Sequence, residues 1–164
     1  MHAIWRTGVL GVVVMLGVVL GAGTGRVSTQ AGDARSGTWK LNVAKSTYRP
    51  GPPPQRLTLH IVASPQGEQV TAEGVTAAGT PTRLQYTAHF DGKDYPLTGS
   101  QNADTISLKR IDARTTERRD KKGDKVVLTY TRLVSEDGKT MTVTVQGTNA
   151  EGQAVDNVQI WEKP

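Results

Sequence analysis

The sequence predicts an all-β domain, a single antiparallel meander of about ten strands that closes into a barrel. Short runs in which apolar and polar residues alternate fill the last two thirds of the chain, and this alternation is typical of sheets with one buried face. No run with helical periodicity follows residue 31. Turn dipeptides separate the runs at Asp91-Gly92, Lys122-Gly123, Asp137-Gly138 and Glu151-Gly152.

Each expected strand is bounded by such turn residues, and most present one apolar face. The run at 114–121 is the exception, because it is polar throughout and is expected to form a solvated hairpin strand. The expected strands cover residues 37–41, 56–63, 69–77, 82–90, 93–98, 104–112, 114–121, 125–135, 139–147 and 154–162.

The first 31 residues have the order of a secretory signal peptide. Arg6 precedes an uncharged apolar run at 8–22, and small residues follow. That run is shorter than the roughly 20 residues of a membrane-spanning helix. Cleavage is expected between residues 23 and 31, after Gly23 or after Ala31, and the protein is expected in the periplasm or outside the cell. The alternative is an uncleaved N-terminal anchor.

After the signal, composition predicts a flexible segment at 32–36 and a barrel domain at 37–164, with a proline-rich crossover at 48–55. The chain has no cysteine, which excludes disulfides, thiol catalysts and thiolate metal sites. A small exported domain without disulfides needs another source of stability, and closing the sheet on itself provides one.

Charge and aromatic content narrow the function further. The formal net charge of +5 falls by two when Arg6 and Arg26 are removed with the signal, and this mild excess gives no support for a nucleic-acid partner. Aromatic residues make up only 5% of the chain. A barrel with a partly hollow interior needs few large side chains, so the composition favours a cavity over a fully packed core.

The motif Gly37-Thr38-Trp39-Lys40-Leu41 resembles the opening of the calycins, the lipocalin and fatty-acid-binding-protein group. The resemblance implies a lipocalin-like barrel in which Trp39 plugs one end and Gly37 precedes it. The interval at 42–55 is too short and proline-rich for the helical lid of the fatty-acid binders. The last strand ends Ile160-Trp161-Glu162-Lys163, without their carboxylate-binding Arg-x-Tyr, so fatty-acid specificity is not implied.

Further patterns along residues 37–163 resemble a group of exported bacterial proteins. They read Asn42-x-Ala44-Lys45-Ser46, Pro50-Gly51-Pro52-Pro53, Asp91-Gly92-Lys93-Asp94-Tyr95-Pro96, Lys109-Arg110-Ile111-Asp112 and Asp137-Gly138-Lys139-Thr140.

Candidate ligand-binding residues come from polar side chains on apolar strand faces. Tyr130 and Arg132 share a face with Leu128, Arg110 continues the apolar face of its strand, and Tyr86 does the same on another strand. If these faces point inward, a guanidinium and a phenol lie beside apolar walls and are suited to the carboxylate or phosphate head of an amphipathic ligand. The alternative is that Arg132, near a strand end, extends to water.

We find no catalytic constellation and therefore expect no enzyme. The chain has no Ser–His–acid order, phosphate loop or nucleotide fingerprint. His60 and His89 are each one position off an apolar face and are expected to point to solvent, so neither a metal site nor a cofactor is predicted.

Two hypotheses remain for function. The first is an exported, non-enzymatic barrel that binds a small apolar or amphipathic ligand. The alternative is a cell-envelope interaction module with a packed core, acting on an anionic lipid or polysaccharide through a basic hairpin at 109–125, which carries eight basic and four acidic residues.

Overall fold

The computed structural model describes residues 32–164, and the expected signal peptide at 1–31 lies outside them. The predicted all-β meander is confirmed, because this part of the chain forms ten strands and no helix. No helix in it is long and apolar enough to cross a membrane. The strands are β1 (Gly37–Thr47), β2 (Arg56–Ala63), β3 (Gly67–Val75), β4 (Pro81–His89), β5 (Asp91–Pro96), β6 (Thr105–Arg110), β7 (Thr115–Lys122), β8 (Lys125–Val134), β9 (Thr140–Thr148) and β10 (Ala154–Glu162).

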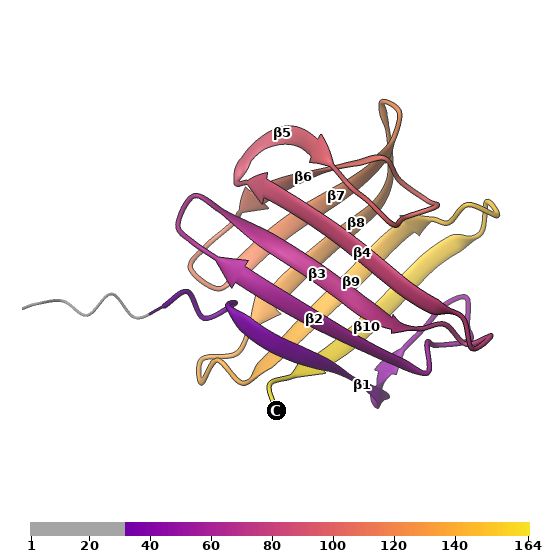
Figure 1. The fold of residues 1–164 in the computed structure, drawn as a ribbon, viewed down its shortest axis with the longest axis horizontal. Coiled ribbons are helices and arrows are strands. Elements are labelled where there is room, and N and C mark those ends of the chain that lie inside the picture. The colour runs from indigo at the N-terminus through magenta and orange to yellow at the C-terminus, as the bar shows by residue number, and fades with distance from the viewer. Residues whose placement is uncertain (1–31) are drawn as a thin grey trace, which may run out of the picture. The chain divides into compact units, whose positions relative to one another are not determined.

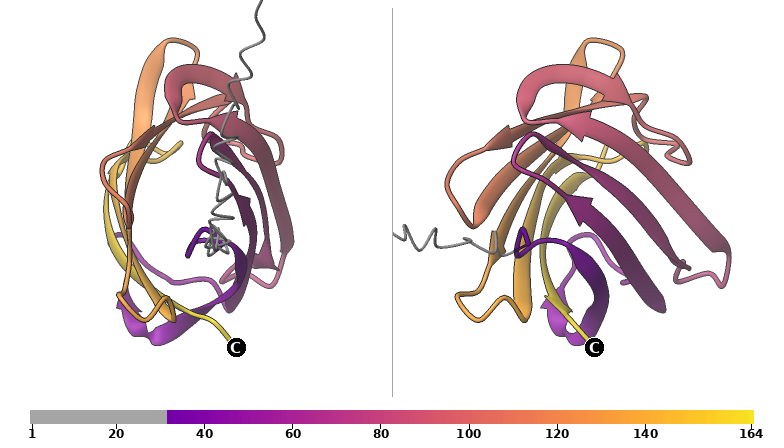
Figure 2. Two further views of the ribbon diagram at one scale, coloured as in Figure 1. Left: turned by 90° about the vertical axis from the view of Figure 1, so that its left-hand side faces the viewer. Right: turned by 60° about the vertical axis from the view of Figure 1, so that its left-hand side comes forward.

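The strands form one antiparallel sheet in the order β4-β3-β2-β1-β10-β9-β8-β7-β6-β5. Every strand pairs with its neighbour in sequence except β4 with β5, and β1 also pairs with β10. Because the first strand pairs with the last, the sheet curls round on itself into a barrel (Figure 1), which the left view of Figure 2 shows as a ring. One seam between β4 and β5 keeps the barrel from closing fully.

A single bridge holds this seam. The backbone amides of Gln85 and Thr98 each donate to the carbonyl of the other at 3.0 Å. Gly99 follows with a φ of 81°, and a Cβ atom added there would lie 1.9 Å from the carbonyl oxygen of Arg83. The chain after β5 therefore approaches β4 closely only because residue 99 has no side chain.

Three of the four predicted turns are confirmed, and one is wrong. Gly123, Gly138 and Gly152 have positive φ and lie in loops between strands. The dipeptide Asp91-Gly92 instead begins β5, where the register with β6 shifts between Asp91 and Asp94. Gly92, with a φ of 74°, belongs to this irregularity. A β-bulge and a hairpin loop select the same residue types, which explains the error.

Inward-facing side chains form the core. Alternate residues of the strands are buried, and tryptophans from β1 and β10 are among the largest of them. The buried apolar residues at the centre include Trp39, Ile61, Val70, Ile106, Leu108, Met141, Val143, Val145 and Trp161. Polar residues interrupt this core from several sides.

Strand β7 corrects the expectation of a solvated hairpin at residues 114–121. Thr116 is 1% exposed and Asp120 is 2% exposed, and the side chain of Arg118 between them is 11% exposed. The strand alternates like the others, but its inward residues are polar. Because the residues on both faces of β7 are polar, the sequence does not reveal which face points inward.

One end of the barrel is covered by the segment at 32–36, for which composition predicts flexibility. Arg35 is 2% exposed, and its carbonyl accepts a hydrogen bond from Trp39 Nε1 at 2.8 Å. Trp39 itself is fully buried, and Lys163 Nζ lies 4.6 Å from its ring centre. Between β1 and β2 the chain runs without strand pairing over the proline-rich residues 48–55.

Candidate ligand-binding site

A cavity of about 510 Å³ opens at the end of the barrel opposite Trp39. Inward residues of three strands, Leu84, Asp120, Leu128 and Tyr130, form its inner part. Loop residues and the start of β4 form its rim, and these are Thr76, Thr80, Pro81, Thr82, Arg83, Gly99, Ser100, Gln101 and Asn102. This volume lies within the range of roughly 300–1,000 Å³ that small-molecule sites occupy. We call it the mouth cavity.

At the inner part of the mouth cavity, Asp120 forms an ion pair with Arg118 next to the ring of Tyr130. Arg118 donates through Nε and Nη2 to the two carboxylate oxygens of Asp120, each at 2.6 Å. Its guanidinium also lies 4.3 Å from the ring centre of Tyr130 and 5.0 Å from that of Tyr86. Burial raises the pKa of Tyr130 to about 12, so its phenol stays neutral and offers a hydroxyl to the cavity.

Deeper in the barrel, Glu68 joins two of the predicted residues. Arg132 Nη2 and the hydroxyl of Tyr86 both donate to Glu68 Oε1, each at 2.6 Å. Burial by itself would raise the pKa of Glu68, but the charge of Arg132 and the hydrogen bonds from Tyr86 and Arg132 outweigh it, and the pKa is lowered. Glu68 therefore remains a carboxylate although its side chain is fully buried.

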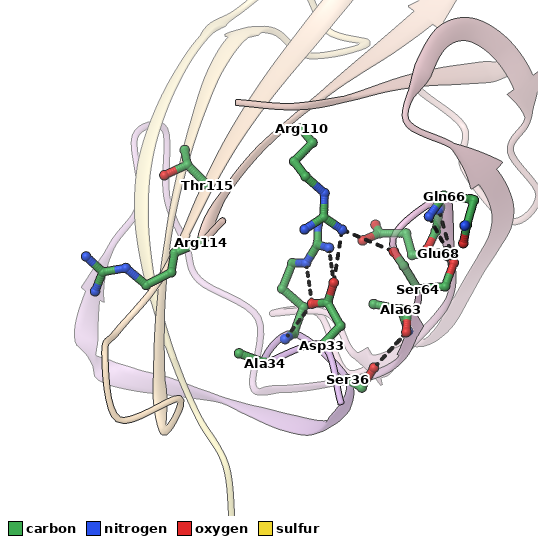
Figure 3. A network of polar contacts seen from close by, with 12 residues as sticks. Asp33, Ala34, Ser36, Ala63, Ser64, Gln66, Glu68, Arg110, Arg114 and Thr115 are labelled. Carbon is green, nitrogen blue, oxygen red and sulfur yellow. Dashed lines mark hydrogen bonds and ion pairs between the residues drawn. The ribbon is translucent and has the colours of Figure 1, made fainter. Parts of the chain in front are cut away.

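At the end of the barrel near Trp39, one carboxylate serves two guanidiniums. Asp33 accepts from Arg35 Nε at 2.8 Å and from Arg110 Nη2 at 3.0 Å, and Arg110 also donates to the carbonyl of Ser64 at 3.1 Å (Figure 3). Both guanidiniums lie over the ring of Phe90, at 4.6 and 4.9 Å from its centre. This contact anchors residues 32–36 to β6.

The structure places all five predicted ligand-binding residues along the interior, but in three groups. Tyr130 and Leu128 line the mouth cavity. Tyr86 and Arg132 meet at Glu68, with Arg132 only 5% exposed and so turned inward and not to water. Arg110 lies at the far end with Asp33. Gly37, expected in a structural role, has a φ of 127° at the start of β1.

Sequence reasoning missed the residues that connect these groups: Glu68, Arg118, Asp120, Asp33 and Arg35. Glu68 lies one residue before the expected strand, and a lone carboxylate next to a glycine is typical of a turn. Arg118 and Asp120 are two residues apart in β7, the spacing of side chains on one strand face. This spacing was the available signal, although nothing in the strand marked that face as the inner one.

The outer surface is less suited to a specific site. A hollow of about 450 Å³ lies over Thr58, His60 and Arg83, residues that alternate with inward ones on β2 and β4. Several outward cations of the 109–125 hairpin have acidic partners: Arg119 pairs with Glu117 at 2.8 Å and Lys121 with Asp94 at 2.7 Å. The positive charge of the hairpin is thus partly compensated.

Both histidines of the barrel domain, His60 and His89, are exposed. Among residues 32–164, no group of three or more His, Cys, Asp or Glu side chains is arranged to hold a metal ion.

No protein-family model matches the chain, and no curated protein matches it. A solved structure that is similar is the crystal structure of zebrafish ileal bile acid-binding protein complexed with cholic acid. The two share 14% sequence identity and a TM-score of 0.50, and the match covers 80% of this chain and 99% of that chain. No comparison supports the resemblance to a group of exported bacterial proteins. The likeness shows the fold alone, and in fold the chain is a calycin-like barrel.

Proposed function

We propose that this protein is an exported, non-enzymatic carrier that binds a small amphipathic molecule inside its barrel. The observation that carries the proposal is the mouth cavity, which joins apolar walls from Leu84 and Leu128 to the hydroxyl of Tyr130. Polar residues make up most of the remaining lining, so the cavity suits an amphipathic molecule better than a purely apolar one.

Two further features support a carrier. The far end of the barrel is covered by Trp39 and Arg35, both nearly inaccessible to solvent, so a guest enters from one side. The similar zebrafish barrel was crystallised with cholic acid, an amphipathic small molecule, and the analogous use of the interior is part of this proposal.

Fluorescence titration tests the proposal. The protein is titrated with 1-anilinonaphthalene-8-sulfonate, an environment-sensitive apolar probe, while probe and tryptophan emission are recorded. We expect saturable binding of one probe per barrel. Leu128→Trp, which fills the mouth cavity, should weaken binding at least tenfold, since roughly 1.4 kcal/mol of lost contact corresponds to that factor.

Val126→Trp is the matched control, because Val126 lies on the same strand but is 41% exposed on the outer face. It should leave probe binding unchanged. Equal binding by both variants, or no saturable binding by the parent protein, would refute the carrier proposal. Salt-reversible retention on anionic lipid vesicles without probe binding would favour the envelope module instead.

A further inference from the structure

A row of three polar side chains crosses the inner wall of the barrel below the mouth cavity. In the strand register, Arg110 of β6 lies directly opposite Thr116 of β7, and Thr116 lies directly opposite Arg132 of β8. Side chains directly opposite each other on one face have Cβ atoms roughly 5 Å apart. The three side chains therefore form a continuous row, which we call the inner row.

Each member of the inner row has a buried polar atom without a hydrogen-bond partner among residues 32–164. These atoms are Arg110 Nε, Thr116 Oγ1 and Arg132 Nε. Arg35 Nη1 is in the same condition, and Arg35 is paired with the Asp33 that also holds Arg110. Buried polar groups in folded proteins nearly always have partners, so a cluster of unpartnered donors indicates a missing acceptor.

The charge balance of these buried side chains also indicates a missing anion. Three guanidiniums, of Arg35, Arg110 and Arg132, share two carboxylates, of Asp33 and Glu68. Arg118 and Asp120 neutralise each other, so they leave this balance unchanged. We call these three guanidiniums and two carboxylates the inner cluster. It carries one uncompensated positive charge. Glu68 Oε2 also lacks a partner, and it would accept a hydrogen bond but repel a second negative charge.

We propose that the inner row, together with Arg35, is an oxyanion site that holds one carboxylate group. The two guanidinium Nε–H groups and the Thr116 hydroxyl donate to the carboxylate oxygens, and the single negative charge completes the local balance. Charge-assisted hydrogen bonds from Arg to carboxylate are about twice as strong as neutral ones. The same chemistry serves the head group of an amphipathic guest or a free small carboxylate.

The site lies within reach of the mouth cavity. Arg132 is two residues along β8 from Tyr130, which lines that cavity, and two residues of a strand span about 7 Å. In the proposal, a guest with its apolar body in the mouth cavity extends a head group over this distance to Arg132, which does not itself line the cavity. In this form the inference deepens the proposed function and rests on it.

Thr116→Val is the decisive variant. Because its hydroxyl has no partner among the described residues, replacing it by a methyl group of similar shape should not lower the melting temperature without ligand. Binding is measured for dodecanoate and dodecan-1-ol, which share a tail, and for sodium acetate against sodium chloride at equal ionic strength. Thr131→Val, an exposed position on β8, is the matched control.

We expect dodecanoate to bind at least tenfold more tightly than dodecan-1-ol, and Thr116→Val to reduce dodecanoate affinity about tenfold with no effect on the alcohol. A melting temperature raised by acetate, but not in Thr116→Val, would identify a free carboxylate as the occupant. Both results support the oxyanion site.

Equal binding of acid and alcohol, unchanged by Thr116→Val, would overturn the oxyanion site while leaving the carrier proposal intact. If acetate stabilises the protein and neither dodecyl probe binds, the carrier proposal fails and the oxyanion site stands. If no probe has any effect, both are overturned.

Discussion

Arg132 and Glu68 face each other across the barrel, from β8 and β3, and form an ion pair of 2.6 Å between Nη2 and Oε1. Both side chains are almost inaccessible to water. The two strands are not neighbours in the sheet, so this pair connects opposite walls through the interior. The polar interior is thus built of matched charges, and its one mismatch is the excess guanidinium of the inner cluster.

The first prediction concerns this ion pair. Arg132→Met leaves Glu68 as a buried carboxylate with Tyr86 as its remaining hydrogen-bond partner among the described residues, and Glu68→Gln leaves the guanidinium without its counter-charge. Each single substitution should lower the free energy of unfolding by about 3–5 kcal/mol. Urea denaturation of both variants and of the double variant measures this.

The double variant, Arg132→Met with Glu68→Gln, measures the coupling energy between the two side chains. Since removing both charges leaves no unpaired ion, its loss should be clearly smaller than the sum of the two single losses. Additive losses would contradict an energetic coupling between Arg132 and Glu68.

The second prediction concerns acid stability. The pKa of Glu68 lies below its usual value of 4.5 in the folded protein, and that of Asp33 lies far below its usual value of 3.8 because hydrogen bonds and charge from Arg35 and Arg110 outweigh burial. The folded state therefore binds fewer protons than the unfolded chain at low pH. Stability from both groups is complete above about pH 5 and falls as the pH drops through the lowered values.

Unfolding by urea between pH 3 and pH 7 checks this expectation. The parent protein should lose stability steadily below pH 5, and Glu68→Gln should show a shallower loss because it has one fewer group to protonate. A slope that is identical in both proteins would show that Glu68 does not contribute.

The third prediction concerns the seam between β4 and β5. Gly99→Ala adds a Cβ atom at 1.9 Å from the Arg83 carbonyl and does so at a φ of 81°. We expect a loss of more than about 2 kcal/mol, and faster amide exchange at Gln85 and Thr98 as their bridge opens. Gly152→Ala is the control, because Gly152 has a similar φ of 78° but open space around it. Its loss of unfolding free energy, expected to be about 1–2 kcal/mol, measures the cost of the positive φ alone. Equal losses would show that the close approach is unimportant.

The fold could be predicted because the strands carry two independent signals, alternation and glycine-containing turns. The ranges for β2 and β10 coincide with the structure, and most other ends differ by one or two residues. The error at Asp91-Gly92 arose where a bulge uses turn residues. The pairing of β1 with β10, which closes the sheet, was predictable only indirectly, since no residue pattern in either strand indicates it.

The candidate site was less predictable for a physical reason. Apolar faces mark Tyr86, Leu128, Tyr130 and Arg132 as inward, but β7 has polar residues on both faces. Arg118 and Asp120 neutralise each other inside the barrel, and in sequence they look like any exposed ion pair two residues apart. Which charges are buried depends on pairing between distant strands, as with Glu68 on β3 and Arg132 on β8, and alternation along one strand carries no information about that pairing.

The fourth prediction concerns Asp33, the carboxylate shared by Arg35 and Arg110. Asp33→Asn removes the charge that holds two guanidiniums and anchors residues 32–36 at the barrel end. Because Arg35 is almost fully buried, we expect a loss of about 3 kcal/mol in unfolding free energy. The same change raises the excess charge of the inner cluster from one to two. Carboxylate affinity should therefore rise even as the protein becomes less stable, a combination that simple damage to the fold would not produce.

Asp112→Asn is the control, since Asp112 is exposed and accepts backbone hydrogen bonds from Arg114 and Thr115 that an amide oxygen also accepts. It should change stability by less than about 0.5 kcal/mol and leave dodecanoate binding unaltered. Denaturation and titration of the two variants side by side provide the comparison. If Asp33→Asn weakens dodecanoate binding in proportion to its loss of stability, Asp33 only supports the barrel end, and the charge of the inner cluster does not govern its affinity for anions.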